Sequence, residues 1–366
     1  MQKSKKFFEK GFDESTLTKL EIFQQYLINW IPVFIKSKHN KSIYIFDFFA
    51  GPGYDSKNTA GSPIRILEQI QKIQSENLNK KVILFFNEVN KRNYRQLKNT
   101  CEDYLNKNPQ IKKMVEINYL NKEFENSFKE LKQEIGKHPS LVFLDQFGIK
   151  FSTYVSEFEN FDKTDFLIFI SSSYIKRFAN TPEFKKALNL TNDEIEKFKR
   201  TPYKLIHESV VQFLMTKLPY DAKLKLIPFS IKKGSNIYGL IFGTKHILGA
   251  DKFLHVTWKI NPDNGNANYD IYNDEEKKQP NLFPELKDKT TIQVFQEELK
   301  SKILSGEIST NKETYFFTIE KGFLPNHAKE VLVKLRKDGI VKFKSKAPLI
   351  NYNAIKKGRI IKYEKN

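Results

Sequence analysis

Ser42-Ile-Tyr-Ile-Phe-Asp47-Phe-Phe-Ala-Gly51-Pro-Gly53 is the stretch of sequence that decides the fold. Residues 42–49 form a dense run of β-branched and aromatic side chains, which is typical of a strand buried on both faces of a sheet. Gly51 and Gly53 then let the backbone approach a bound molecule without a clash from Cβ. Because ligands of open α/β sheets bind at the carboxyl ends of the strands, the segment predicts a binding loop.

Strands and helices alternate after this segment. Helical patterns at 62–70, 91–105 and 123–135 separate strand patterns at 82–86, 115–118, 141–144 and 166–171. This alternation indicates βαβ units and a parallel sheet. Residues 224–229 and 238–244 then form a hairpin pattern. A mostly parallel sheet that ends in an antiparallel hairpin is the outline of the Rossmann-like, S-adenosylmethionine (SAM)-dependent methyltransferase fold.

The chain of 366 residues is long enough for two or three domains. We expect an N-terminal helical segment at 1–40, a methyltransferase-like Rossmann domain at 41–260 with a helical insertion at 174–220, a linker at 261–290, and a winged helix-turn-helix domain at 291–366. The last domain shows helical patterns at 292–304, 313–318 and 325–337, then strand patterns at 340–344 and 359–363. The helix from Pro325 is the expected recognition helix.

Charge is concentrated at the C-terminal end of the chain. The formal net charge is +19, and residues 296–366 hold sixteen Lys/Arg against eight Asp/Glu. A polyanionic partner, DNA or RNA, is one interpretation. A chain that is simply rich in solvated lysine is the other. The local excess favours a nucleic-acid surface formed by Lys329, Lys334, Arg336, Lys337, Lys342 and Lys344.

The composition also limits where the protein resides. No run approaches about 18 apolar residues, so no membrane span is expected. The basic N-terminus is not followed by the apolar core of a signal peptide, and the single cysteine, Cys101, excludes an internal disulfide framework. We therefore expect a soluble, cytoplasmic protein.

The loop after the first strand is the predicted SAM site. Asp47 places a carboxylate where a ligand ammonium could lie, and Phe49, Gly51 and Gly53 complete the loop. The third glycine of the dinucleotide fingerprint G-x-G-x-x-G is missing, which favours SAM over a dinucleotide. A tight strand-exit loop without any ligand is the alternative interpretation.

Two further residues are assigned to the cofactor. Glu88 follows the second strand, where a carboxylate can accept both hydroxyls of a ribose, although an acid there is also typical of a solvated turn. Asn118 follows the third predicted strand and could bind an adenine edge, or it could simply form a turn.

Asp145 and Phe147 follow the fourth strand and are the predicted catalytic pair. A carboxylate at this position can accept a hydrogen bond or proton from an amine, and an aromatic ring can stack on an extruded base. A helix N-cap followed by a core phenylalanine is the alternative. The six histidines show no metal-ligand spacing, so no metal site is expected. Cys101 lies in a predicted helix, which argues against a cytosine-C5 mechanism.

Four motifs together resemble the three-Cys-motif partner (TcmP) family: Asp47-Phe-Phe-Ala-Gly-Pro-Gly-Tyr54, Gly61-Ser-Pro63, Leu144-Asp-Gln-Phe-Gly148 and Tyr238-Gly-Leu-Ile-Phe-Gly-Thr-Lys-His246. The C-terminal segment resembles the winged-helix module of its longer members. The resemblance implies a SAM-dependent methyltransferase-like domain and a partner protein with a cysteine motif, such as a radical-SAM-like iron–sulfur enzyme.

The chain departs from the family pattern in two places. Gln146 stands where the family usually has proline, and the loop at 54–61 separates Gly53 from the next helix. Both departures bear on whether the site catalyses. One predicted function is therefore amino methylation of a nucleic-acid base, in a modification or anti-phage context. The other is an inactive scaffold that binds nucleic acid and the cysteine-motif partner.

Overall fold

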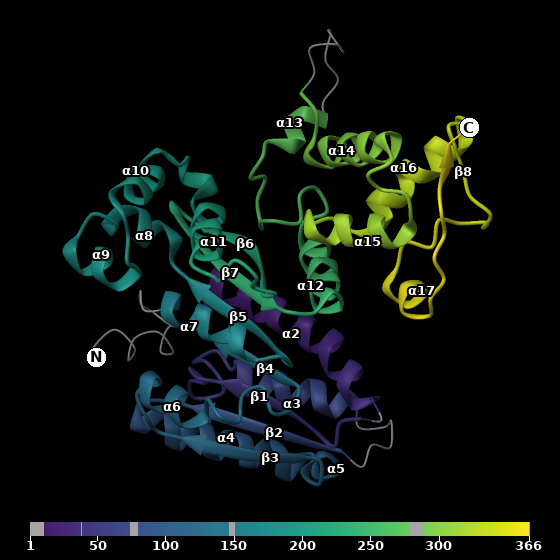
Figure 1. Cartoon of the computed structure of the whole chain (residues 1–366). Helices are drawn as coiled ribbons and strands as arrows, with labels where there is room; N and C mark the ends of the chain where they lie inside the picture. The colour runs from purple at the N-terminus through teal and green to yellow at the C-terminus, as the bar shows by residue number, and fades with distance from the viewer. Residues whose placement is uncertain (1–10, 38, 74–79, 146–150, 279–287, 366) are drawn as a thin grey trace. The chain divides into compact units, whose positions relative to one another are not determined.

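The computed structural model describes residues 11–37, 39–73, 80–145, 151–278 and 288–365. Contacts divide the chain into two units, Met1–Lys245 and His246–Asn366. Each unit is described by itself below, with the element labels of Figure 1. None of the helices in the described residues is long and apolar enough to cross a membrane.

The first unit contains a seven-stranded sheet in the order β3-β2-β1-β4-β5-β7-β6. The strands are β1 Ser42–Asp47, β2 Lys81–Asn87, β3 Val115–Leu120, β4 Ser140–Leu144, β5 Thr164–Ile170, β6 Lys225–Lys233 and β7 Asn236–Thr244. Strands β1 to β5 pair in parallel, and β7 runs antiparallel to both of its neighbours. This is the Rossmann-like methyltransferase fold, and the predicted fold class is confirmed.

Helices flank this sheet, as Figure 1 shows. They are α2 Glu14–Ile35, α3 Ser62–Ile73, α4 Lys91–Lys107, α5 Pro109–Lys112, α6 Phe124–Leu131, α7 Phe151–Glu157, α8 Ser172–Phe178, α9 Pro182–Leu188, α10 Asn192–Arg200 and α11 Ile206–Thr216. Helices α8 to α11 fall where the sequence predicts a helical insertion. The apolar runs explain the core: every residue of β4 and of β5 is buried, as a strand covered on both faces requires.

Helix α2 is fixed to the sheet by polar as well as apolar contacts. The side chain of Asp13 caps its first turn by accepting from the Thr16 N–H at 3.0 Å. Farther along the helix, the Tyr26 hydroxyl and the Trp30 indole N–H both donate to Asp165 Oδ2, at 2.8 and 3.0 Å. Because Asp165 belongs to β5, these bonds fix α2 to the middle of the sheet.

Two glycines of β7 make room for large side chains. A Cβ on Gly243 would lie 2.0 Å from the Phe166 ring, and one on Gly239 would lie 2.2 Å from His207. We expect Gly243→Ala to lower the free energy of unfolding by about 2–3 kcal/mol, because the buried ring cannot move away without strain. Gly234→Ala is the control: its φ of +54° costs about 1 kcal/mol, but no atom lies within 4 Å. Equal losses in urea denaturation of the two variants would contradict this prediction.

The second unit is helical, with a short two-stranded sheet. It consists of α12 Ile247–Ile260, α13 Asp274–Lys278, α14 Thr291–Ser305, α15 Asn311–Glu320, α16 Pro325–Lys337, β8 Val341–Lys342, α17 Tyr352–Lys356 and β9 Glu364–Lys365. Helix α16 packs against both α14 and α15. We call residues 341–365, from β8 through α17 to β9, the wing.

Helix α12 joins this unit, although the predicted first domain extends to residue 260. The Tyr315 hydroxyl donates to Asp251 Oδ2 at 2.9 Å, and the Trp258 indole N–H donates to the Gly322 carbonyl at 2.9 Å. Both bonds connect α12 to the helices that follow it.

The second strand of the wing lies later than predicted. Residues 359–363 do not pair with β8; instead Val341 and Lys342 pair with Lys365 and Glu364. The reason is Asn311, whose side chain accepts from the Ile361 N–H at 2.8 Å and donates to the Arg359 carbonyl at 3.1 Å. These bonds occupy the backbone N–H of Ile361 and the carbonyl of Arg359, which the predicted strand would have needed for pairing with β8.

Candidate functional site

Asp47 lies at the end of β1 and is fully buried. Its Oδ1 accepts from the Phe49 N–H at 3.1 Å. Its Oδ2 has no hydrogen-bond partner among the described residues. Burial raises the pKa of Asp47 to about 7, against the lowering effects of the Ser62 hydroxyl and the Phe49 N–H. Strand β1 therefore ends in a carboxyl group of which one oxygen, Oδ2, can accept a further hydrogen bond.

The glycine loop brings α3 directly to this carboxyl. Gly51 and Gly53 adopt positive φ angles of 66° and 96°. The Gly61 N–H donates to the Gly53 carbonyl at 2.8 Å, and Tyr54 pairs with Ala60. The loop at 54–61 therefore closes on itself. It does not move the helix away, so the positive end of α3 lies beside Asp47.

Glu88 connects the exit of β2 to the same loop. Its side chain is 8% exposed, and its two oxygens accept from the N–H groups of Gly51 and Asn90, at 3.0 and 2.7 Å. Burial raises the pKa of Glu88, and these two hydrogen bonds oppose that rise. The structure therefore brings together Asp47, Gly51 and Glu88, three of the six residues that the sequence assigns to the cofactor.

The sequence pattern predicts that Asn118 follows the third strand, but the structure places it elsewhere. It lies within β3, opposite Phe85, because Tyr119 and Leu120 continue the strand. The residue at the strand exit is Asn121, whose side-chain amide donates to the backbone carbonyls of Glu88 and Val89, at 2.6 and 2.9 Å. The polar pair Asn-Lys after Leu120 is the signal that could have placed this exit correctly.

Asp145 follows β4 and forms an ion pair with Lys19 of α2. Lys19 is 1% exposed, and its ammonium lies 4.5 Å from the centre of the Phe169 ring on β5. Asp145 Oδ1 has no partner among the described residues. No motif in the sequence marked Lys19. A signal was present, because Lys19 lies on the same buried helical face as Leu20 and Phe23, where an apolar residue is expected. Phe147 and Gln146 lie outside the described residues.

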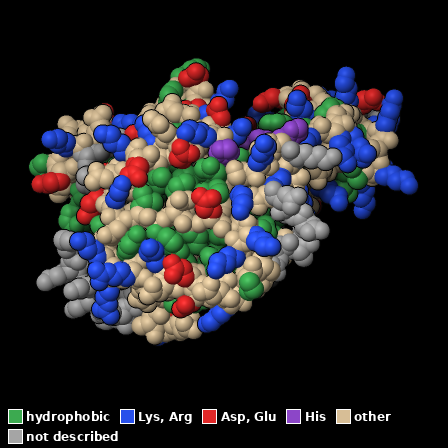
Figure 2. All heavy atoms as spheres, turned by 90° about the horizontal axis from the view of Figure 1, so that it is seen from below, with side chains coloured by type: hydrophobic (Ala, Val, Ile, Leu, Met, Phe, Trp, Pro, Cys, Tyr) green, Lys and Arg blue, Asp and Glu red, His purple; other side chains and the backbone are tan. Residues whose placement is uncertain are grey.

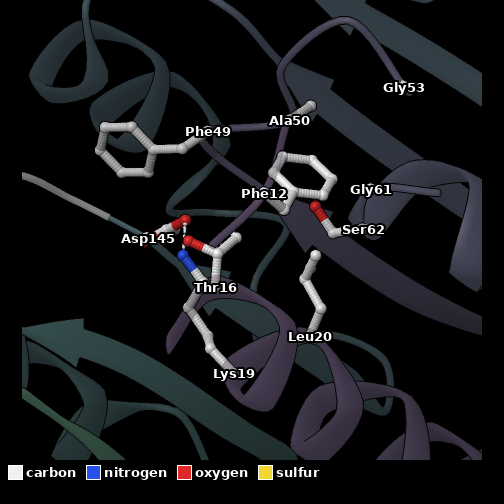
Figure 3. Close-up of a pocket in the computed structure, with 10 residues that line it drawn as sticks. All are labelled: Phe12, Thr16, Lys19, Leu20, Phe49, Ala50, Gly53, Gly61, Ser62 and Asp145. Carbon is white, nitrogen blue, oxygen red and sulfur yellow. Dashed lines mark hydrogen bonds and ion pairs between the residues drawn. The ribbon is translucent and has the colours of Figure 1, made fainter. Parts of the chain in front are cut away.

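Of the predicted site residues, Phe49, Gly53 and Asp145 line one pocket together with Lys19, whereas Asp47 and Glu88 are not among the residues that line it (Figure 3). Lys19 and Thr16 extend from α2 toward Asp145, and Phe12, Leu20 and Ser62 lie on the other side. The cavity volume is about 30 Å³, which is space for about two water molecules. A nucleoside could enter only if lining side chains moved.

The remaining nucleophile candidates are buried away from this pocket. Burial raises the pKa of the Cys101 thiol to about 12, so the sulfur is not a thiolate at neutral pH. His207 is fully buried between the Ser172 hydroxyl at 2.8 Å and the Leu240 carbonyl at 2.9 Å. No group of three or more His, Cys, Asp or Glu side chains in the described part of the chain could hold a metal ion.

The second unit carries the predicted nucleic-acid residues on α16 and the wing. The side chains of Lys329, Lys334, Lys337, Lys342 and Lys344 are exposed. Figure 2 shows Lys and Arg side chains spread over the whole face in view, so the net charge alone does not mark one surface. Residues 339–363, in contrast, contain seven Lys/Arg and no Asp or Glu.

Residues 271–348 match the family model of the GMT-like wHTH domain. This match confirms a winged helix-turn-helix near the C-terminus. Within the domain, Arg336 has a structural contact: its guanidinium donates to the Ser345 carbonyl at 2.9 Å and lies 4.8 Å from the centre of the Phe343 ring. Arg336 therefore connects α16 to the wing.

The solved structures to which this chain is similar include three that are described as O-methyltransferases. One is a putative O-methyltransferase from Klebsiella pneumoniae, with 10% identity and a TM-score of 0.33, which covers 64% of this chain and 90% of that chain. Another is the O-methyltransferase from Bacillus cereus in complex with SAH, with 12% identity, a TM-score of 0.32, and coverage of 60% and 79%. A third is TomG from Streptomyces achromogenes in complex with SAM, with 9% identity, a TM-score of 0.33, and coverage of 64% and 90%. The search of curated proteins found no match.

Proposed function

We propose that the first unit is a SAM-dependent methyltransferase and that the GMT-like wHTH domain delivers a nucleic acid whose base amine is methylated. The observation that carries this proposal is Asp47 Oδ2, a buried acceptor without a partner among the described residues, beside the glycine loop. A buried polar atom without a partner is costly, and functional sites are where such costs are retained. An ammonium group is the partner that a carboxylate oxygen prefers.

The residues of the crevice fit SAM in charge and in donor type. Asp47 would hold the ammonium of the amino-acid tail, and Glu88 would accept from the ribose hydroxyls while it keeps its bond to Gly51. Bound SAM would supply an electrophilic methyl group on its sulfonium. Asp145 would accept the hydrogen bond of the attacking amine and take its proton as the new N–C bond forms and the sulfur–methyl bond breaks, with S-adenosylhomocysteine as the leaving group. Phe147 would stack on the extruded base.

Calorimetry with SAM and with S-adenosylhomocysteine (SAH) tests this proposal. Glu88→Gln is expected to weaken binding of both compounds at least tenfold, because a neutral amide is a poorer acceptor for two ribose hydroxyls. Glu102→Gln, at an exposed position of α4, removes the same charge and is the control. Absence of binding heat at millimolar SAM, with a folded protein, would exclude the enzymatic proposal.

One observation favours the second candidate, a scaffold that binds nucleic acid and a cysteine-motif partner without catalysis. The Lys19–Asp145 ion pair occupies the position where a target amine would be held, and the cavity is small. Nucleic-acid binding that persists without any SAM binding would support the scaffold. The partner and the modification or anti-phage context stay predictions.

A further inference from the structure

Lys19 is an unusual residue at its place in the fold. Among the described residues that line the pocket, it carries the only positive charge. The Lys19 side chain is 2% exposed and that of Asp145 is 19% exposed. Such a largely buried ion pair gains little net stability, because desolvation of the charges offsets their attraction. An apolar pair of similar size would serve packing as well, so stability does not explain why a lysine is held here.

The position of Lys19 is well defined. Tyr26 and Trp30 of the same helix are bonded to Asp165, and Asp13 caps the first turn. The ammonium therefore reaches the exits of β4 and β5 from a fixed helix. The lysine stem is long and flexible, so the ammonium can change partners without movement of α2.

Among the described residues in and beside the pocket, the carboxylates of Asp47, Glu88 and Asp145 outnumber the one ammonium, that of Lys19. Asp145 and Glu88 both lie close enough to Asp47 for their charges to raise the pKa of the Asp47 carboxyl. An amino-acid tail brings an ammonium, which suits Asp47, and also a carboxylate, which needs a cation. Lys19 lies in the same pocket as Gly53, Gly61 and Ser62, and it is the cation of that pocket (Figure 3).

We propose that Lys19 is a positioning residue that binds the carboxylate of the cofactor's amino-acid tail, and that its ammonium leaves Asp145 to do so. This inference rests on the proposed function. Lys19 donates to Asp145 Oδ2 and so offsets the negative charge of the carboxylate that a target amine would need. When the tail binds, Asp145 becomes free to accept from the amine. Cofactor binding would thus precede productive target binding.

The test compares SAH with decarboxylated SAH, which keeps the ammonium and lacks the carboxylate. Lys19→Met is expected to weaken SAH binding on the order of 10- to 100-fold, as loss of a charge-assisted hydrogen bond does, and to change decarboxylated SAH less than threefold. Asp145→Asn is expected to change the affinity for SAH in the opposite direction. SAH should bind several-fold tighter to this variant, because Lys19 no longer has to leave a charged partner. Lys36→Met, at the other end of α2, is the control for loss of charge.

The outcomes separate the two proposals. If the parent protein binds neither ligand, the proposed function and this inference both fail. If the parent binds SAH and Lys19→Met weakens both ligands equally, Lys19 has no role at the carboxylate. If Asp145→Asn weakens SAH as Lys19→Met does, the ion pair is only structural. If Lys19→Met fails to fold, two other variants test the inference. Lys19→Arg must keep the preference for SAH over decarboxylated SAH, and Asp145→Asn must increase this preference.

Discussion

Asp47→Asn is expected to make the protein more stable at pH 8 and to remove most of its affinity for SAM. The folded protein holds the pKa of Asp47 at about 7 because the side chain is fully buried, whereas the ordinary pKa of an aspartate is 3.8. Between pH 3.8 and about pH 7, the Asp47 carboxyl is ionised in the unfolded chain but keeps its proton in the folded protein. The stability that this proton contributes is complete below pH 3.8 and is lost as the pH rises through about 7.

Urea denaturation from pH 5 to pH 8 measures this effect. The asparagine does not titrate, so the difference in unfolding free energy between variant and parent should grow by about 1.4 kcal/mol per pH unit up to pH 7 and then level off. Between pH 5 and pH 7 the difference should therefore grow by about 3 kcal/mol. Parallel curves for the two proteins would show that Asp47 is ionised throughout.

Asp55→Asn is the matched control, since its expected pH dependence is opposite. Burial raises the pKa of Asp55, but the N–H groups of Thr59, Phe12 and Lys57 outweigh burial, and the pKa is lowered. The stability that Asp55 contributes is therefore present at neutral pH and lost in acid. Asp55→Asn should destabilise the protein at pH 7 and lose this effect as the pH falls.

The loss of SAM affinity in Asp47→Asn follows from the same carboxyl. Removing one partner of a buried charged pair costs at least about 30-fold in affinity. In the parent protein the affinity for SAM should rise as the pH increases through about 7, because Asp47 ionises there. In the variant it should be low and independent of pH over this range. A variant that gains stability and loses its ligand would show that the buried acid is retained for binding.

The sequence alone predicted the sheet and the meeting of Asp47 and Glu88 at the candidate site. Each central strand is a short apolar run, and parallel strands have neighbouring carboxyl ends, so Asp47 and Glu88 had to meet once the strand order was known. The hairpin at the sheet edge was predictable because its turn residues separate two apolar runs. Such patterns report on local structure and on the burial of one segment at a time.

The remaining features depend on contacts between distant segments. Lys19 meets Asp145, which is 126 positions away in the chain, and no local pattern relates the two. Asn311 binds the backbone of residues 359–361 and so shifts the last strand of the wing. The end of β3 was misplaced because Asn118 is polar, although its backbone still pairs with Phe85. In each case a tertiary contact overrides the local preference.

The second large effect is expected at the wing. Replacing Lys342, Lys344 and Lys346 together with glutamine should lower the affinity for duplex DNA or RNA at low salt. All three side chains are exposed, and residues 339–365 contain one acid, Glu364, which is the cross-strand neighbour of Lys342. Each phosphate contact contributes about 0.9 to the slope of log K against log salt for B-DNA. The slope should therefore decrease by about 2–3 units. Arg336 stays in place, because its guanidinium connects α16 to the wing.

The matched control replaces Lys91, Lys107 and Lys113 with glutamine, three exposed lysines of the first unit. Both triple variants have the same net charge, so long-range attraction alone would weaken nucleic-acid binding equally in both. Fluorescence anisotropy over a series of salt concentrations separates the two cases. A changed slope in the wing variant alone would identify the wing as a phosphate-binding surface. Equal slopes in the two variants would mean that the basic C-terminal region acts only through its total charge, and that the GMT-like wHTH domain contacts another partner.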